Sequence, residues 1–225
     1  MKLSWRFRDR RCHTPDSVRL SNDRMYKGER FNAWAHLVGL LLTLGFLVHA
    51  GAAASQADRV SALGVLVFLA TAGAAYFASI LAHSTRGEAQ RRWVKLDHCA
   101  IFLLIAGSLT PFALSAPRQA ENLVAMGLVW ALAGIAFMRQ LRAPAASPAV
   151  PHYLLLGWCA VLAAAPVAMR LSGPALDWLL AGAAFYSVGT VFYRNPRGWA
   201  HAHGVWHLFV VAGTSSHYAA VCHLA

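Results

Sequence analysis

Seven long apolar stretches follow one another along the chain, and short polar gaps separate them. Each stretch is close to the about 20 residues that an α-helix needs to cross the roughly 30 Å hydrocarbon core of a lipid bilayer. The stretches are Ala33–Ala54, Ser61–Ala82, Asp97–Leu114, Asn122–Met138, Val150–Met169, Pro174–Tyr193 and His203–Ala225. The pattern therefore predicts an all-α protein, a bundle of seven transmembrane helices.

The composition excludes an ordinary soluble domain. Hydrophobic residues make up 58% of the chain and charged residues only 13%, whereas a typical soluble domain has about 25% charged residues. We predict a basic N-terminal segment over residues 1–31 and a single seven-helix domain over residues 32–225. The cysteines are scattered and form no CxxC pair, which argues against a disulfide framework or a thiolate zinc site.

The basic residues predict the orientation of the bundle. The net charge of +11 could indicate nucleic-acid binding, but the Lys and Arg residues lie in the N-terminal segment and in the gaps between apolar stretches. Seventeen of the twenty fall on one side of the predicted bundle, and only Arg59, Arg118 and Arg170 fall on the other. Because basic residues concentrate on the cytoplasmic side, we expect a cytoplasmic N-terminus and an extracytoplasmic C-terminus, and no nucleic-acid partner.

Ionisable and polar side chains gather at one predicted depth. Such residues are costly inside membrane helices, so they usually face the bundle interior and mark a site. With the N-terminus inside, six of them lie near the cytoplasmic leaflet although they are far apart in the sequence. They are His36, Ser79, His83, Asp97, His203 and His207.

The spacing of these residues is typical of a metal site. His203 and His207 are four residues apart, which places both imidazoles on one helix face, one turn apart. His83 would supply a third ligand and leave a fourth position open, as in a catalytic zinc site. Asp97 could accept a proton from water there, and Ser79 lies one turn before His83. A single membrane-embedded His is more often a packing residue or a proton relay, and we interpret His49, His217 and His223 in that way.

Three motifs resemble those of the hemolysin III family, the bacterial branch of the progestin and adipoQ receptors. The run from Asp97-His98 to Thr110-Pro111-Phe112 resembles its third-helix signature. The segments Gly28-Glu29-Arg30-Phe31-Asn32 with Ala35-His36, and His203-Gly204-Val205-Trp206-His207, resemble its first and last motifs. The resemblance implies seven helices, a bacterial inner-membrane location and a zinc site. Ala35, Ala82 and Leu109 depart from the residues common in the family, but none is a proposed ligand.

Carried over residue by residue, the resemblance implies zinc ligands at His83, His203 and His207, with Ser79 and Asp97 as catalytic neighbours. We expect Asn32, His36 and His98 to surround this site. The wider superfamily includes membrane-embedded zinc amide hydrolases, which favours a zinc-dependent hydrolase of a lipid amide or ester. Two other hypotheses stay open: a cytolytic or pore-forming protein, and a receptor or regulator of membrane homeostasis with structural zinc.

Overall fold

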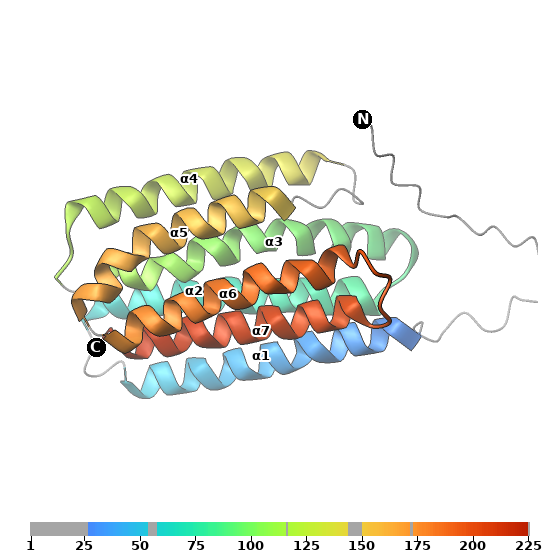
Figure 1. The fold of residues 1–225 in the computed structure, drawn as a ribbon, viewed down its shortest axis with the longest axis horizontal. Coiled ribbons are helices and arrows are strands. Elements are labelled where there is room, and N and C mark those ends of the chain that lie inside the picture. Colours follow the sequence, from blue (N-terminus) through green and yellow to red (C-terminus); the bar gives the residue numbers. More distant parts are fainter. Residues whose placement is uncertain (1–26, 54–57, 116, 144–149, 172, 225) are drawn as a thin grey trace, which may run out of the picture.

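The computed structural model describes residues 27–53, 58–115, 117–143, 150–171 and 173–224. These residues form seven helices that run side by side in one bundle (Figure 1). The helices are α1 (Lys27–Ala53), α2 (Arg59–Ser84), α3 (Gly87–Leu114), α4 (Ala120–Arg142), α5 (Val150–Leu171), α6 (Gly173–Arg194) and α7 (Ala202–Cys222). The predicted all-α class is confirmed for the described part of the chain, which contains no strand.

Six of these helices, α1 to α6, are long and apolar enough to cross a membrane. Helix α7 has 21 residues, but its three histidines and its Ser and Thr residues make it less apolar. It nevertheless lies inside the bundle, against α1, α3 and α6. A multi-pass membrane protein is therefore confirmed, while seven spans and the orientation of the termini stay predictions. Most of the predicted N-terminal segment, residues 1–26, lies outside the described residues, as do Cys12 and residues 144–149 of the predicted loop after α4.

The outer surface of the bundle is apolar. Val48, Leu155 and Leu162 expose 75%, 68% and 69% of their surface, which would be unfavourable in water and suits contact with lipid chains. The interior is built around α3, which contacts α2, α4, α5 and α7. Its buried residues include many alanines, and such small side chains let membrane helices approach one another closely.

Two helices begin earlier than the apolar stretches that predicted them. Helix α1 starts at Lys27 rather than near Ala33, and α3 starts at Gly87 rather than at Asp97. Hydropathy marks only the residues that sit in hydrocarbon, whereas a helix can continue into the polar interface with its backbone hydrogen bonds intact. The extra turns of α1 carry Glu29 into the helix, and this residue belongs to the site described below.

Candidate metal centre

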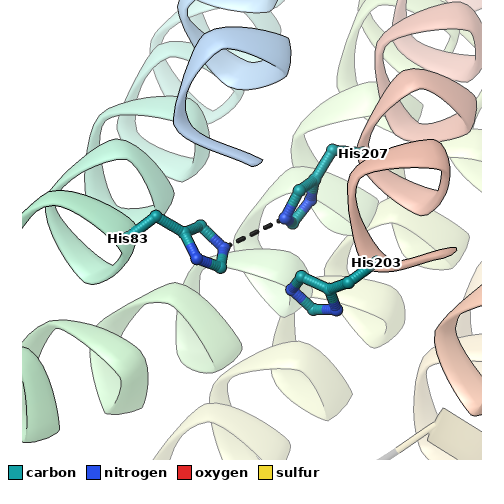
Figure 2. Close-up of side chains that lie close together, drawn as sticks. All are labelled: His83, His203 and His207. Carbon is teal, nitrogen blue, oxygen red and sulfur yellow. Dashed lines mark hydrogen bonds between the residues drawn. The ribbon is translucent and has the colours of Figure 1, made fainter. Parts of the chain in front are cut away.

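Three histidine side chains converge at the end of the bundle where α2 ends and α7 begins. Figure 2 shows His83 of α2 facing His203 and His207 of α7. Ligand nitrogens of the three rings all lie within 4.8 Å of one another, and the Nε2 atoms of His83 and His207 are 3.0 Å apart. His207 is only 2% exposed. The structure thus brings together, from residues 124 positions apart, the three imidazoles that the sequence predicted as ligands.

The local structure of α7 explains this convergence. His203 and His207 are one helical turn apart, and their ring centroids are 4.5 Å apart. Gly204 lies against Phe31 and Asn32 of α1, where a Cβ atom would collide with both side chains. The missing side chain at Gly204 lets α1 approach the first turn of α7. As a result α1 packs next to the histidines of α2 and α7.

Helix α1 contributes a carboxylate to which the sequence analysis gave no role. Glu29 Oε2 lies 2.5 Å from His83 Nδ1 and also accepts a hydrogen bond of 3.3 Å from Asn32 Nδ2. A proton on His83 Nδ1 donates to this carboxylate, which leaves the lone pair on Nε2 directed toward the other two imidazoles. Carboxylates that orient metal-binding histidines in this way are common in metal sites. The signal was present in the sequence, because Glu29, Asn32 and His36 are spaced at i, i+3 and i+7 and therefore share one helix face.

The donor set and its geometry fit a metal ion. With His83 Nδ1 protonated, the Nε2 atoms of His83 and His207 face each other at 3.0 Å, and two lone pairs at that distance repel unless a proton or cation lies between them. Tetrahedral Zn²⁺ with Zn–N bonds near 2.0–2.1 Å holds its nitrogens about 3.4 Å apart. The three rings can meet this spacing with small side-chain adjustments. Three neutral imidazoles are also ligands that suit zinc.

Ser79 and Asp97 lie beside this cluster. Ser79 is fully buried one turn before His83. Asp97 of α3 is partly buried, next to Ser79 and within electrostatic reach of His83. The structure therefore places a carboxylate and a hydroxyl next to the imidazoles, while their predicted catalytic roles stay predictions.

The three residues expected around the site lie at different distances from it. The His36 ring packs against that of His207 with centroids 3.9 Å apart, and it also contacts Tyr76. Asn32 reaches the site through Glu29. His98 makes no hydrogen bond or ring contact with the three imidazoles in the described part of the chain, and its carbonyl accepts a hydrogen bond from Tyr153. His36 and Asn32 thus lie beside the site and His98 makes no direct contact with its imidazoles, while the roles expected of all three stay predictions.

The histidines that we interpreted as packing residues lie away from the cluster. His49 Nδ1 is 2.8 Å from the hydroxyl of Tyr218, near the far end of α1 and α7. His217 is buried in the middle of the bundle, beside Gly182 of α6 and the ring of Tyr186. Neither belongs to a group of side chains that could hold a metal, within the described residues.

A family model described as Haemolysin-III related matches residues 25–218, which include all of the residues of the candidate metal centre. The chain belongs to this family. It is 33% identical over 198 residues to Hemolysin-3 of Bacillus cereus, a match that covers 84% of this chain and 88% of the relative. It is also 32% identical over 194 residues to a Hemolysin-3 homolog of Bacillus subtilis (strain 168), covering 84% and 91%.

A more distant similarity extends beyond these bacterial proteins. The chain is 24% identical over 237 residues to an adiponectin receptor protein of Drosophila melanogaster, a match that covers 88% of this chain and 50% of the receptor. The haemolysin III family and its relation to adipoQ receptors, inferred from three short motifs, are thus confirmed over most of the sequence. The match begins at residue 25, so the family shares the helical bundle and leaves most of the basic N-terminal segment outside.

Proposed function

We propose that this haemolysin III-related protein is a zinc-dependent hydrolase that cleaves an amide or ester bond of a membrane lipid. The observation that carries the proposal is the convergence of three imidazole nitrogens within 4.8 Å of one another at one end of a membrane bundle. Beside them lie the carboxylate of Asp97 and the buried hydroxyl of Ser79. Three ligands that leave a position open are typical of catalytic rather than structural zinc.

Each residue of the site has a separate task in this proposal. Zinc, when bound, supplies a Lewis acid that polarises the scissile carbonyl and makes water acidic enough to act as a nucleophile at neutral pH. Asp97 accepts the proton that this water loses and passes it to the leaving group. Ser79 donates a hydrogen bond to the negative charge that develops on the carbonyl oxygen. Glu29 holds His83 in the tautomer that leaves its Nε2 lone pair free.

An apolar cavity next to the site supports a lipid as the substrate. It has a volume of about 100 Å³ and lies between α3, α5, α6 and α7. Tyr193 and Trp206, which both line this cavity, stand at its junction with the site, because the Tyr193 ring is 5.7 Å from that of His203 and 5.5 Å from that of Trp206. A lipid chain in the cavity would bring its polar end to the imidazoles.

The proposal includes the topology that the basic residues predict. We infer seven spans, a cytoplasmic N-terminal segment over residues 1–31, a transmembrane domain over residues 32–225 and a location in a bacterial inner membrane. The site then faces the cytoplasmic leaflet. A reporter enzyme fused after Ala225 should be active only on the extracytoplasmic side. Activity on the cytoplasmic side would show that α7, or one of the other predicted spans, does not cross the membrane.

The catalytic proposal is tested with Asp97→Asn. Purified protein in liposomes is offered a panel of lipid amides and esters, and the products are measured by mass spectrometry. Because Asn cannot accept the proton, we expect the variant to keep its fold and most of its zinc while turnover falls by a factor of about 100 or more. Undiminished hydrolysis by Asp97→Asn would refute the general-base role. A joint loss of zinc and thermal stability, in a wild type that hydrolyses none of the lipids, would instead indicate structural zinc in a receptor or regulator.

The name of the Bacillus cereus relative, Hemolysin-3, favours a second candidate function, the permeabilisation of membranes. A pore needs a continuous polar path through both leaflets, whereas the cluster of unpaired polar groups described here lies at one end of the bundle. Release of a trapped dye from liposomes measures this directly. Equal dye release by wild type and by His207→Ala would support a cytolytic activity that is independent of the metal.

A further inference from the structure

A groove lies between α4 and α5, on the side of the bundle away from α1 (Figure 1). The groove has a volume of about 520 Å³. Its apolar walls include Leu132 of α4 and Leu155 and Cys159 of α5, and its polar end carries Arg139 and His152. It shares no residue with the candidate metal centre, which is formed by α1, α2, α3 and α7.

The walls of this groove face outward. Leu132 and Leu155 expose 51% and 68% of their surface, and Cys159 is also exposed. Within a bilayer these side chains meet hydrocarbon rather than water, so an open groove at this depth is filled by a lipid chain. A protein segment would need its own backbone hydrogen bonds satisfied before it could lie there.

The polar end of the groove has positive charge without a compensating carboxylate. Arg139 lines the groove, and Arg142 lies three residues further along, in the same last turn of α4. Both side chains are exposed. No Asp or Glu occurs in the sequence between Glu121, at the other end of α4, and Asp177 in α6. Neither guanidinium forms an ion pair in the described part of the chain. By contrast, Arg92 pairs with Glu88 and Arg118 pairs with Asp58.

We propose that the groove between α4 and α5 binds an anionic glycerophospholipid, with its phosphate on Arg139 and Arg142 and one acyl chain along Leu132, Leu155 and Cys159. The last turn of a helix cannot itself attract an anion, because its free carbonyl groups carry partial negative charge. The binding energy for the phosphate therefore comes from the two guanidinium groups and from His152 at the mouth of the groove. Basic pockets between transmembrane helices recognise anionic lipid head groups in this way.

The experiment compares two lipids with identical acyl chains, phosphatidylglycerol and phosphatidylcholine, bound to the full-length protein in detergent. Native mass spectrometry counts the lipids retained, and thermal unfolding with each added lipid measures the stabilisation. We expect wild type to retain phosphatidylglycerol at least about tenfold better than phosphatidylcholine, because each interfacial Arg adds a favourable contact with an anionic head group. The double variant Arg139→Gln, Arg142→Gln should lose this preference.

A control with the same change in charge is available at the same end of the bundle. Arg91 and Arg194 are exposed and lie outside the groove, so the double variant Arg91→Gln, Arg194→Gln should keep the preference of the wild type. Loss of the preference in this control as well would reduce the effect to general surface charge and overturn the proposal. Equal retention of the two lipids by wild type would overturn it too.

The acyl chain is tested by filling the groove. Leu155→Trp places a large side chain where the chain should lie, at an exposed position that the fold tolerates, and should weaken retention of both lipids. Glycerol phosphate, which has the head group without the chains, should neither stabilise the protein nor compete with phosphatidylglycerol. Full competition by glycerol phosphate would show a site for free phosphate esters instead. Zinc content should be unchanged in all of these variants, so this proposal and the proposed hydrolase can fail independently.

Discussion

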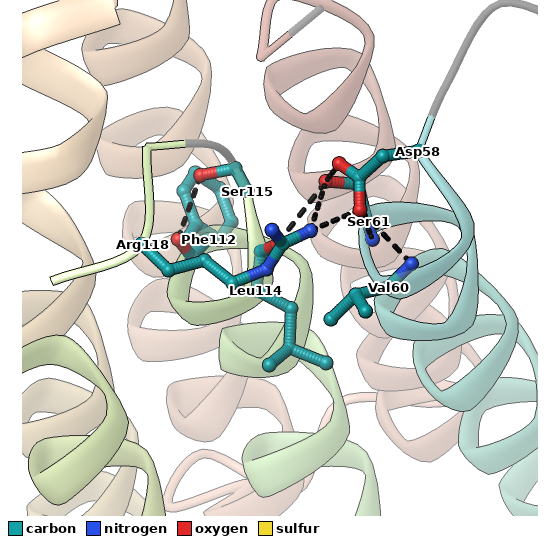
Figure 3. A network of polar contacts seen from close by, with 7 residues as sticks. All are labelled: Asp58, Val60, Ser61, Phe112, Leu114, Ser115 and Arg118. Carbon is teal, nitrogen blue, oxygen red and sulfur yellow. Dashed lines mark hydrogen bonds and ion pairs between the residues drawn. The ribbon is translucent and has the colours of Figure 1, made fainter. Parts of the chain in front are cut away.

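The two ends of α2 carry polar clusters that differ in how completely their groups are paired. At its start, Asp58 accepts hydrogen bonds from the backbone N–H groups of Val60 and Ser61 and from the hydroxyl of Ser61, at 3.0, 3.2 and 2.6 Å. Arg118 donates to the same carboxylate and to Ser61, and the Ser61 hydroxyl also lies 3.1 Å from the carbonyl of Leu114 (Figure 3). This cluster joins the start of α2 to the end of α3, and its polar groups are hydrogen-bonded to one another.

The cluster around His83 lies 25 residues after Asp58, at the other end of α2, and its polar groups are less completely paired. Three imidazoles face one another, and the Nδ1 atom of His207 and both ring nitrogens of His36 are buried without a hydrogen-bond partner among the described residues. A buried polar group without a partner costs about 1–3 kcal/mol. Several such groups in one place lower the stability of the fold, and binding of a ligand to them would offset this cost. The comparison indicates that the paired cluster serves the fold and that the cluster around His83 could hold a metal ion.

The largest expected effect is the loss of the metal. Replacing His203 and His207 together by Ala leaves a single imidazole, which cannot hold zinc at a tetrahedral site. We expect the wild-type protein to contain stoichiometric zinc and the double variant only background zinc, as measured by elemental mass spectrometry of the purified proteins. The exposed His223 at the end of α7 supplies the control, since His223→Ala should retain full zinc. Full zinc in the double variant would disprove the site.

A smaller effect is expected from Glu29→Gln. The amide keeps the size of the side chain but removes the charge that holds His83 in its metal-binding tautomer. Loss of such an orienting carboxylate costs about 10–100-fold in metal affinity, and a competition titration with a chelator measures it. Glu88→Gln is the matched control at the same end of the bundle, because Glu88 pairs with the exposed Arg92 and with no other side chain among the described residues. If the two variants bind zinc equally well, Glu29 does not orient His83.

The smallest effect is expected at the paired cluster. Asp58→Asn should lower the melting temperature by only about 2 °C or less, since exposed ion pairs contribute little, and should leave zinc content unchanged. Hydrogen bonds from Ser61, Arg118 and Val60 lower the pKa of Asp58 from 3.8 to about 2. The ionised carboxylate of Asp58 therefore stabilises the folded state above pH 4, and this stabilisation is lost as the pH falls from about 4 through about 2.

A pH series of melting curves measures this effect. The difference in melting temperature between wild type and Asp58→Asn should be constant from pH 7 to about 5. It should shrink as the pH falls from about 4 to about 2, because the carboxylate takes up a proton first in the unfolded state and then in the folded state. A difference in melting temperature that grew on acidification would mean that the carboxylate destabilises the fold. The interpretation that this cluster stabilises the packing of α2 against α3 would then be wrong.

Local patterns in the sequence were sufficient for the helices and for the two imidazoles of α7. Hydropathy locates a transmembrane helix because each residue contributes to it independently of the rest of the chain. In the same way, the spacing of His203 and His207 determines their common face, since both lie on one continuous helix. The family followed from three short motifs, and the match over residues 25–218 confirms it.

Contacts between helices were decided only in the tertiary structure. The distance of 3.0 Å between the Nε2 atoms of His83 and His207 depends on how α2 packs against α7, and the role of Glu29 depends on the close approach of α1 at Gly204. Hydropathy could not predict the groove between α4 and α5, because a side chain that faces lipid and one that faces a neighbouring helix are equally apolar. The sequence by itself determined which segments form long apolar helices and which residue types these helices carry. Packing decided which of those side chains meet, since the contact of two helices depends on the shapes of both.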